Sequence, residues 1–247
     1  GQRVAVLRMR PGAQCLQEVK VLIRLRHPHL VRYLGMCTAA TETLIVTELA
    51  PLGSLDNFLN DREGRVSLEH KLVMAHQICR GMAALAEQGL IHRDLAARNV
   101  LVFADAPSPL VKVTDFGLTV NAYGATHMSV PGEQVPFRWM PPEALRRRRF
   151  SEKSDVWAYG VTLWELLTDA EIPYALIPSD TTVAENVLAG TRLSEPPGCP
   201  PELWSVMQRC WEASADARPT FQELLSLVGT LDGSTVQMGE PVEPVPM

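Results

Sequence analysis

The feature that most constrains the fold is the uneven distribution of strand and helix signals along the chain. Short apolar runs typical of strands lie early, at Arg3–Arg8, Leu30–Leu34 and Leu44–Leu49. One helical stripe, Cys15–Arg26, separates the first two runs. Beyond residue 50 the apolar spacing is mostly helical. Strands first and helices afterwards predict an α+β fold with two lobes.

The second part of the chain is predicted to be built on helices. Pro51-Leu52-Gly53 predicts a turn, and Ser54 is a candidate cap for a short helix. The longest predicted helix, Leu68–Gln88, is amphipathic and rich in Ala, Met and Leu. A stretch punctuated by Gly and Pro runs from Gly117 to Pro142. Two short strands are predicted at Val100–Phe103 and Leu110–Val113, and further helices at Ser154–Leu167, Thr182–Ala189, Pro201–Trp211 and Phe221–Leu231.

The composition excludes several classes of protein. The 247 residues allow one or two domains with a sizeable core, and 46% of them are apolar. A net charge of −5 gives no reason to expect nucleic acid as a partner. The five cysteines are scattered without a CxxC pair, which favours reduced thiols over disulfides or a metal site. No apolar run approaches the ~20 residues of a membrane span, and no signal peptide is recognisable.

Three segments in a fixed order carry the chemistry. They are His92-Arg93-Asp94-Leu95-Ala96-Ala97-Arg98-Asn99, Asp115-Phe116-Gly117 and Pro141-Pro142-Glu143. Phosphoryl transfer needs a carboxylate near the attacking hydroxyl and oxygen ligands for magnesium, a hard cation. Asp94 suits the first role, and Asn99 and Asp115 the second. The ordered set resembles the catalytic loop, magnesium loop and activation-segment end of protein kinases.

This resemblance implies a nucleotide site and its residues. Mg²⁺ and ATP are the expected cofactors, with Arg98 helping to position the substrate and the base. Thr47 matches the gatekeeper and Glu48-Leu49-Ala50 the hinge that binds adenine through its backbone. Phe116 falls in the family's hydrophobic spine with Leu22, Tyr33 and His92. The cofactor-binding residues implied are Ala5, Glu18, Thr47, Glu48, Ala50, Leu101 and Asp115.

The loop sequence also resembles the tyrosine-kinase group. Serine/threonine kinases usually carry a lysine where this chain has Ala96, whereas Ala96-Ala97-Arg98 matches a form typical of tyrosine kinases. Pro136-Phe137-Arg138-Trp139-Met140 resembles the platform beneath the residue that follows the substrate tyrosine. The expected partners are therefore a protein substrate with a tyrosine and ATP. The expected location is intracellular, either cytosolic or in the cytoplasmic part of a receptor.

Further roles of individual residues stay open. Tyr123, as phosphotyrosine, is a candidate partner of Arg93 that orders the loop, or it is an exposed tyrosine without a switch role. Glu18 matches the family's glutamate that pairs with a strand lysine, or it lies on a solvated helix face. Asp155 resembles a brace of the catalytic loop, and Glu143 with Arg218 an ion pair. The run Arg146–Arg149 is a solvated surface or a site for acidic substrates.

Two departures from the family concern the nucleotide. The glycine-rich loop should precede the strand, but only Gly1-Gln2-Arg3 does. The strand reads Val4-Ala5-Val6-Leu7, so Leu7 replaces the lysine that holds phosphate. Because side chains alternate along a strand, Ala5 and Leu7 are predicted to face the cleft and Arg8 to point away, unless a bulge turns Arg8 inward.

The predicted organisation is one kinase domain over residues 1–231. About 1–50 form a partial N-lobe with the hinge, 51–231 form the C-lobe, and the Pro- and Glu-rich residues 232–247 are expected to be disordered. The start at Gly1, directly before a strand, suggests a fragment. Three hypotheses follow: an active tyrosine kinase, a pseudokinase or regulatory binding module, and a partial domain without independent function.

Overall fold

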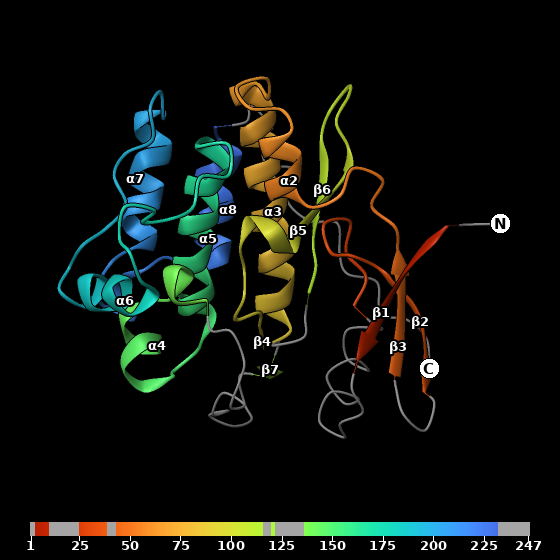
Figure 1. Cartoon of the computed structure of the whole chain (residues 1–247), viewed down its shortest axis with the longest axis horizontal. Coiled ribbons are helices and arrows are strands. Elements are labelled where there is room, and N and C mark those ends of the chain that lie inside the picture. Colours follow the sequence, from red (N-terminus) through yellow and green to blue (C-terminus); the bar gives the residue numbers. More distant parts are fainter. Residues whose placement is uncertain (1–2, 10–24, 39–42, 116–119, 122–135, 232–247) are drawn as a thin grey trace.

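A small antiparallel sheet and a larger, mainly helical part make up the structure (Figure 1). The computed structural model describes residues 3–9, 25–38, 43–115, 120–121 and 136–231. In Figure 1 the sheet lies at one end of the molecule and the helices at the other, with a two-stranded hairpin between them. This confirms the predicted α+β class.

The sheet consists of β1 (Val4–Met9), β2 (Tyr33–Thr38) and β3 (Thr43–Glu48), in the order β1-β3-β2. Strand β1 pairs with β3 in continuous register, from Val4 opposite Glu48 to Met9 opposite Thr43. Directly opposed residues of an antiparallel pair share a face. Every second residue of β3 is buried, so the sheet has one buried and one more exposed face.

The hairpin between the two parts is formed by β5 (Val100–Ala104) and β6 (Leu110–Val113). The chain entering β2 is anchored to it, because Val31 N donates to Val113 O at 2.9 Å and Val113 N donates to His29 O at 2.9 Å. On the other side, Leu52 N donates to Val102 O at 3.2 Å. The hairpin thus connects the sheet, the segment after β3 and the helical part.

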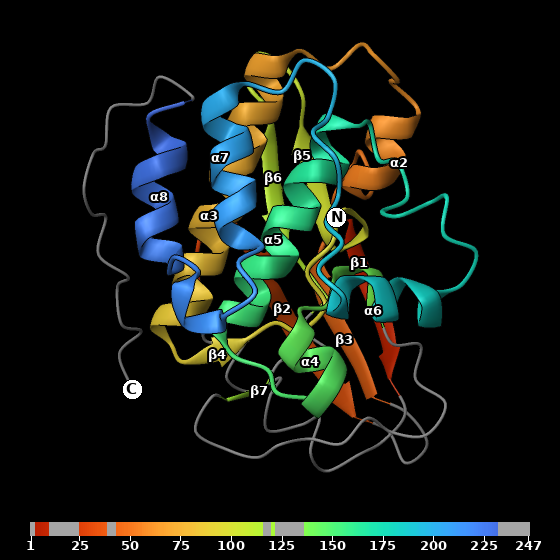
Figure 2. The same ribbon diagram turned by 90° about the vertical axis from the view of Figure 1, so that its left-hand side faces the viewer.

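The helical part is packed around α3 (Leu68–Glu87) and α5 (Glu152–Leu167). Their buried sides are apolar, and Ser67 and Ser151 cap their N-termini by accepting backbone N–H groups. In Figure 2, α7 and α8 lie beside these two helices. The remaining helices are α2 (Leu55–Asn60), α4 (Pro142–Arg147), α6 (Asp180–Leu188), α7 (Pro201–Cys210) and α8 (Phe221–Gly229).

Most predicted elements are present, with shifted ends, and a few differ. The strand predicted at Leu30–Leu34 begins only at Tyr33, because Leu30 and Val31 are buried against the hairpin. Helix α4 was not predicted, nor was the short pair of β4 (Leu90–Ile91) with β7 (Val120–Asn121). Most of the stripe Cys15–Arg26 and the whole tail 232–247 lie outside the described residues. Among the helices that are described, none is long and apolar enough to cross a membrane.

Candidate active site

The β5–β6 hairpin brings the two predicted magnesium ligands together. Asn99 directly precedes β5 and Asp115 lies two residues beyond β6, and the register pairs Val100 with Val113. A hydrogen bond of 2.9 Å from Thr114 N to Asn99 O closes this end of the ladder. Two residues 16 positions apart in sequence are therefore neighbours because an antiparallel ladder joins the segments that carry them.

The segment predicted as the catalytic loop, His92–Asn99, is anchored by the buried carboxylate of Asp155 on α5. Asp155 Oδ2 accepts from His92 N at 2.7 Å and Oδ1 accepts from Arg93 N at 2.9 Å. Burial raises the pKa of Asp155 to about 7, against these two stabilising N–H groups. Arg93 has a positive φ of 72°, a conformation that L-residues rarely adopt and that these anchors support.

His92 links this loop to the end of the hairpin. Its Nε2 lies 2.9 Å from Thr114 O, and Asp94 N donates to its Nδ1 at 3.3 Å. The second contact requires an unprotonated Nδ1, so the proton is on Nε2, which donates a hydrogen bond to Thr114 O. Burial lowers the pKa of His92, which favours this neutral form. The imidazole thus connects the catalytic loop, through Asp94 N, to the segment before Asp115, through Thr114 O.

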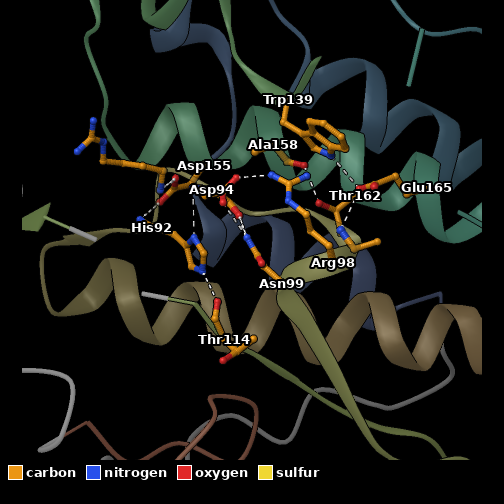
Figure 3. Close-up of polar contacts among 12 residues, drawn as sticks. His92, Asp94, Arg98, Asn99, Thr114, Trp139, Asp155, Ala158, Thr162 and Glu165 are labelled. Atoms are coloured by element: carbon orange, nitrogen blue, oxygen red, sulfur yellow. Dashed lines mark hydrogen bonds and ion pairs between the residues drawn. The ribbon is translucent and has the colours of Figure 1, made fainter. Parts of the chain in front are cut away.

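Asp94 has a partner on each carboxylate oxygen (Figure 3). Arg98 Nη2 donates to Oδ1, and Asn99 Nδ2 donates to Oδ2 at 2.9 Å and to the backbone oxygen of Asp94 at 2.6 Å. These donors fix the direction of the carboxylate. Burial raises the pKa of Asp94, while Arg98 acts in the opposite direction. A carboxylate oriented in this way is suited to receive a proton from a bound hydroxyl group.

Glu165 on α5 joins the catalytic loop to the segment before α4 (Figure 3). Its Oε2 accepts from Ala97 N at 3.0 Å and from Trp139 Nε1 at 2.9 Å. The guanidinium of Arg98 lies 4.5 Å from the centre of the Trp139 ring, a cation–π contact. Asp94, Arg98, Trp139 and Glu165 therefore form one connected set. The signal that would have revealed Glu165 is a lone carboxylate in the apolar run Trp164–Leu167, since buried charges need partners.

The residues predicted to contact the nucleotide base lie on β3, the segment after it and β5. Thr47 is buried on β3, and opposite it in the register stands Ala5, which is half-buried. An isolated bridge from Ser54 to Leu101 sets this half-buried leucine beside the chain that follows the hinge. Within the described residues, the backbone N–H of Ala50 has no hydrogen-bond partner. This donor is available to a ligand.

The side chain of Glu48 fastens the end of β3. Its Oε1 accepts from Arg32 N at 2.8 Å and from Lys112 Nζ at 2.7 Å. Lys112 stands opposite Leu101 in the hairpin, so this ion pair connects the hinge to β6. The carboxylate of Glu48 is therefore engaged by protein groups, and so is its backbone N–H, which donates to Arg32 O at 3.1 Å.

Strand β1, which is predicted to face the phosphates, carries Leu7 where the family pattern has a lysine. Leu7 stands opposite Ile45 and shares the face of Thr47 and Ala5, whereas Arg8 stands opposite Leu44 on the other face. The register of β1 is continuous, so no bulge turns Arg8. The described lysines are engaged elsewhere: Lys71 with Asp169, Lys112 with Glu48 and Lys153 with the backbone of Arg218.

The segment after the candidate site is fixed by a second ion pair. Arg218, only 2% exposed, donates from Nη1 to Glu143 Oε1 at 2.7 Å and from Nη2 to Oε2 at 2.9 Å. It also donates to the backbone oxygens of Glu212 and Lys153. This bidentate pair joins the start of α4 to the turn before α8, as the sequence suggested.

The comparisons with known proteins agree with this geometry. The family model described as protein tyrosine and serine/threonine kinase matches residues 6–228. The chain belongs to this kinase family. Its curated relatives place this kinase domain in the tyrosine-kinase group. It is 40% identical to "Tyrosine-protein kinase Abl" of Drosophila melanogaster over 91% of this chain and to "Tyrosine-protein kinase csk-1" of Caenorhabditis elegans over 87%.

One further relative bears on activity. The kinase domain is 38% identical, over 86% of its length, to "Inactive tyrosine-protein kinase 7" of Gallus gallus. The chain spans only part of each relative: 14% of the Abl protein, 39% of csk-1 and 21% of the inactive kinase. Family membership is thus shown, whereas catalytic competence has to be argued from the site.

The described donor set fits a magnesium ion that is shared with phosphate. No group of three or more His, Cys, Asp or Glu side chains in the described residues forms a closed metal site. Mg²⁺ usually keeps several waters and takes only one or two carboxylates in addition to substrate phosphates. Asn99 donates its Nδ2 to Asp94, so its Oδ1 is directed elsewhere, and Asp115 is exposed. One amide oxygen and one exposed carboxylate match that pattern.

Three predicted site residues, Glu18, Phe116 and Tyr123, lie outside the described residues. Their roles, including the pairing of phosphorylated Tyr123 with Arg93, remain predictions. The guanidinium of Arg93 lies 4.3 Å from the centre of the Phe150 ring.

Proposed function

We propose that this kinase domain transfers the γ-phosphoryl group of ATP to tyrosine hydroxyl groups of protein substrates. The observation that supports this most directly is the orientation of Asp94 by Arg98 and Asn99, one on each carboxylate oxygen. A hydroxyl group placed beside this carboxylate transfers its proton to it as the oxygen attacks. Arg98, stacked on Trp139, keeps the carboxylate in position.

The proposed nucleotide site uses the remaining residues. Asn99 and Asp115 hold Mg²⁺, Glu48 and Ala50 offer backbone groups to adenine, and Ala5, Thr47 and Leu101 provide apolar surface. Mg²⁺–ATP, when bound, would supply the phosphoryl group, and the metal cation would offset the negative charge of the phosphates. Arg98 and Ala96, in the places typical of tyrosine kinases, favour tyrosine over serine or threonine.

A specific observation favours a second function, a regulatory module without turnover. Leu7 shares a face with Thr47, and the described lysines all have other partners. Apolar side chains give phosphates no hydrogen-bond donor, so weak nucleotide binding is expected. In this second reading the domain acts by binding a protein partner.

Phosphotransfer to a tyrosine peptide with Mg²⁺–ATP tests the first function. The control is Asp94→Asn, which keeps the shape of the side chain but cannot accept the proton. We expect turnover that the control lowers by about 10²–10⁴-fold. Turnover no higher than that of the Asp94→Asn variant would reject the first function. Little or no thermal stabilisation by Mg²⁺–ATP, together with the lack of turnover, would then support the regulatory module.

A further inference from the structure

The four consecutive arginines Arg146–Arg149 form the most concentrated positive charge in the sequence. Arg146 and Arg147 end helix α4, and Arg148 follows it with a positive φ of 51°. Arg146, Arg147 and Arg149 are exposed, and Arg148 is half-buried. Cations near a helix C-terminus are favoured by its dipole, which accounts for the first two arginines but not for the two beyond the helix.

These charges are not compensated within the described part of the chain. None of the four arginines forms an ion pair with a described carboxylate, whereas Arg62, Arg98, Arg138 and Arg218 each do. The nearest carboxylates in sequence have other partners. Glu143 is taken by Arg218, and Glu152 accepts from Phe221 N at 2.8 Å. The four guanidinium groups therefore produce a local positive potential.

The arginine run lies close to the catalytic loop through a short series of contacts. The guanidinium of Arg148 lies 5.8 Å from the centre of the Phe137 ring. Phe137 and Trp139 belong to one short 3₁₀ helix, η3 (Phe137–Trp139), and Arg98 stacks on Trp139 while contacting Asp94. These contacts link Arg148 to Asp94 through η3 and Arg98, and an extended peptide advances about 3.3 Å per residue, so we expect a segment bound at Asp94 to reach Arg148 and its neighbours.

From Asp94, the contacts of η3 lead toward α6 and α4. Helix α6 packs against α4 (Figure 2) and against η3. Asp180 at its start is paired with Arg138 at 2.7 Å. Exposed Glu185 lies on the same helix. An extended anionic membrane surface would meet these acidic groups as well as the arginines. A single peptide strand covers a narrower surface than a membrane, and Asp180 beside Phe137 is already neutralised by Arg138.

We propose that Arg146–Arg149 bind acidic residues on one side of the substrate tyrosine, so that the preferred substrates are acidic protein segments. This inference rests on the proposed function, because it names the substrate class of that site. The expected effect is one-sided, since the four arginines are consecutive and lie at the end of one helix, α4. Exposed charge pairs are weak and are screened by salt, so the preference is modest and disappears at high ionic strength.

The test compares the full chain with a triple variant, Arg146→Gln, Arg147→Gln and Arg149→Gln. Arg148 is kept because it contacts Phe137. The matched control is Arg65→Gln, Arg80→Gln and Arg209→Gln, which removes the same charge from exposed positions outside α4, α6 and η3. Three tyrosine peptides are used: one with glutamates before the tyrosine, one with glutamates after it, and one with glutamines on both sides.

Binding of fluorescent peptides is measured without ATP, and kcat/KM is measured with ATP. We expect one glutamate peptide to be preferred over the glutamine peptide by about fivefold at low salt. The triple variant should lose that preference and the control variant should keep it. Salt at about 0.5 M should abolish the preference in the original chain and in the control variant. Because binding needs no turnover, a lack of activity in both chains would count against the proposed function alone.

Three results would overturn the inference. They are the absence of any preference in binding, an equal loss for both glutamate peptides in the triple variant, and an equal loss in the control variant. Binding to vesicles of anionic phospholipid that the triple variant loses, without a one-sided peptide effect, would assign the arginines to a membrane instead.

Discussion

The catalytic loop and strand β1 carry residues proposed for the substrate and the nucleotide, and the two segments are fixed in the fold by different kinds of contact. The loop rests on buried polar anchors: Asp155 accepts two backbone N–H groups and Glu165 accepts one more. Strand β1 pairs with β3 alone in the described sheet, and its side chains Val6 and Leu7 are 53% and 47% exposed.

This difference indicates which half of the site limits function. Buried carboxylates accept the backbone N–H groups of His92, Arg93 and Ala97. This leaves the loop little freedom, because an alternative position would leave these N–H groups without acceptors. An exposed apolar side chain imposes no such constraint and offers phosphate no donor. The proposed phosphoryl transfer therefore has a rigid substrate half, and we expect the nucleotide half to set its rate.

The largest effect is expected from removing the anchor of the catalytic loop. Asp155→Ala leaves the N–H groups of His92 and Arg93 buried without acceptors, at about 1–3 kcal/mol each. The free energy of unfolding, measured by urea denaturation, should fall by about 3 kcal/mol or more. Asp155→Asn keeps one acceptor oxygen and should lose roughly half as much. Equal values for the two variants would mean that the loop is not held by these bonds.

A smaller effect, confined to nucleotide binding, is expected when β1 receives a charge. Leu7→Lys places an ammonium group on the face of Thr47, and a charged hydrogen bond is worth about 1.5–3 kcal/mol. The Kd for Mg²⁺–ATP, measured by calorimetry, should fall about tenfold or more. Stability should change by less than about 0.5 kcal/mol, because the position is half-exposed.

The matched control for this variant is Val6→Lys. It adds the same charge to the neighbouring exposed residue, but on the face that Val46 shares. Nucleotide affinity should stay at the original value. An equal gain in both variants would show that the added charge acts at long range and that the face of Leu7 has no special role.

The same two regions show what sequence can and cannot predict. The residues predicted to be catalytic lie in contiguous segments of the sequence. Strands β5 and β6 are apolar runs with clear ends, and their predicted bounds agree with the structure to within one residue. Leu30 and Val31 also form an apolar run, but they pack on the hairpin instead of extending β2. Helix α4 begins with Pro142 at its first position, which is a start signal for a helix, but no helix is predicted there from the sequence.

The contact of Glu165 with Ala97 and Trp139 shows a different limit. The partners lie 68 and 26 residues away in sequence, and only the packing of α5 brings them together. Local spacing carries no information about such pairs. A buried carboxylate within an apolar helix indicates that partners exist, but not which ones.

The smallest predicted effect is a change in how stability depends on pH. Burial raises the pKa of Glu165 to about 7, whereas its ordinary value is 4.5. Between these pH values the folded chain keeps a proton that the unfolded chain has lost. The unfolded state binds fewer protons there, so the free energy of unfolding falls as pH rises from 4.5 to about 7 and then levels off.

Replacing this group should flatten part of that slope. Glu165→Gln does not titrate, and its amide oxygen can still accept from Ala97 N and Trp139 Nε1. We expect the loss of stability between about pH 5 and pH 8 to be smaller in the variant by about 1 kcal/mol, well below the limit set by ~1.4 kcal/mol per pKa unit. Urea denaturation across this range measures it. Some slope should remain, because Asp155 also has a pKa raised to about 7. Parallel pH profiles for both chains would mean that Glu165 titrates near its ordinary value, and that its two N–H donors outweigh its burial.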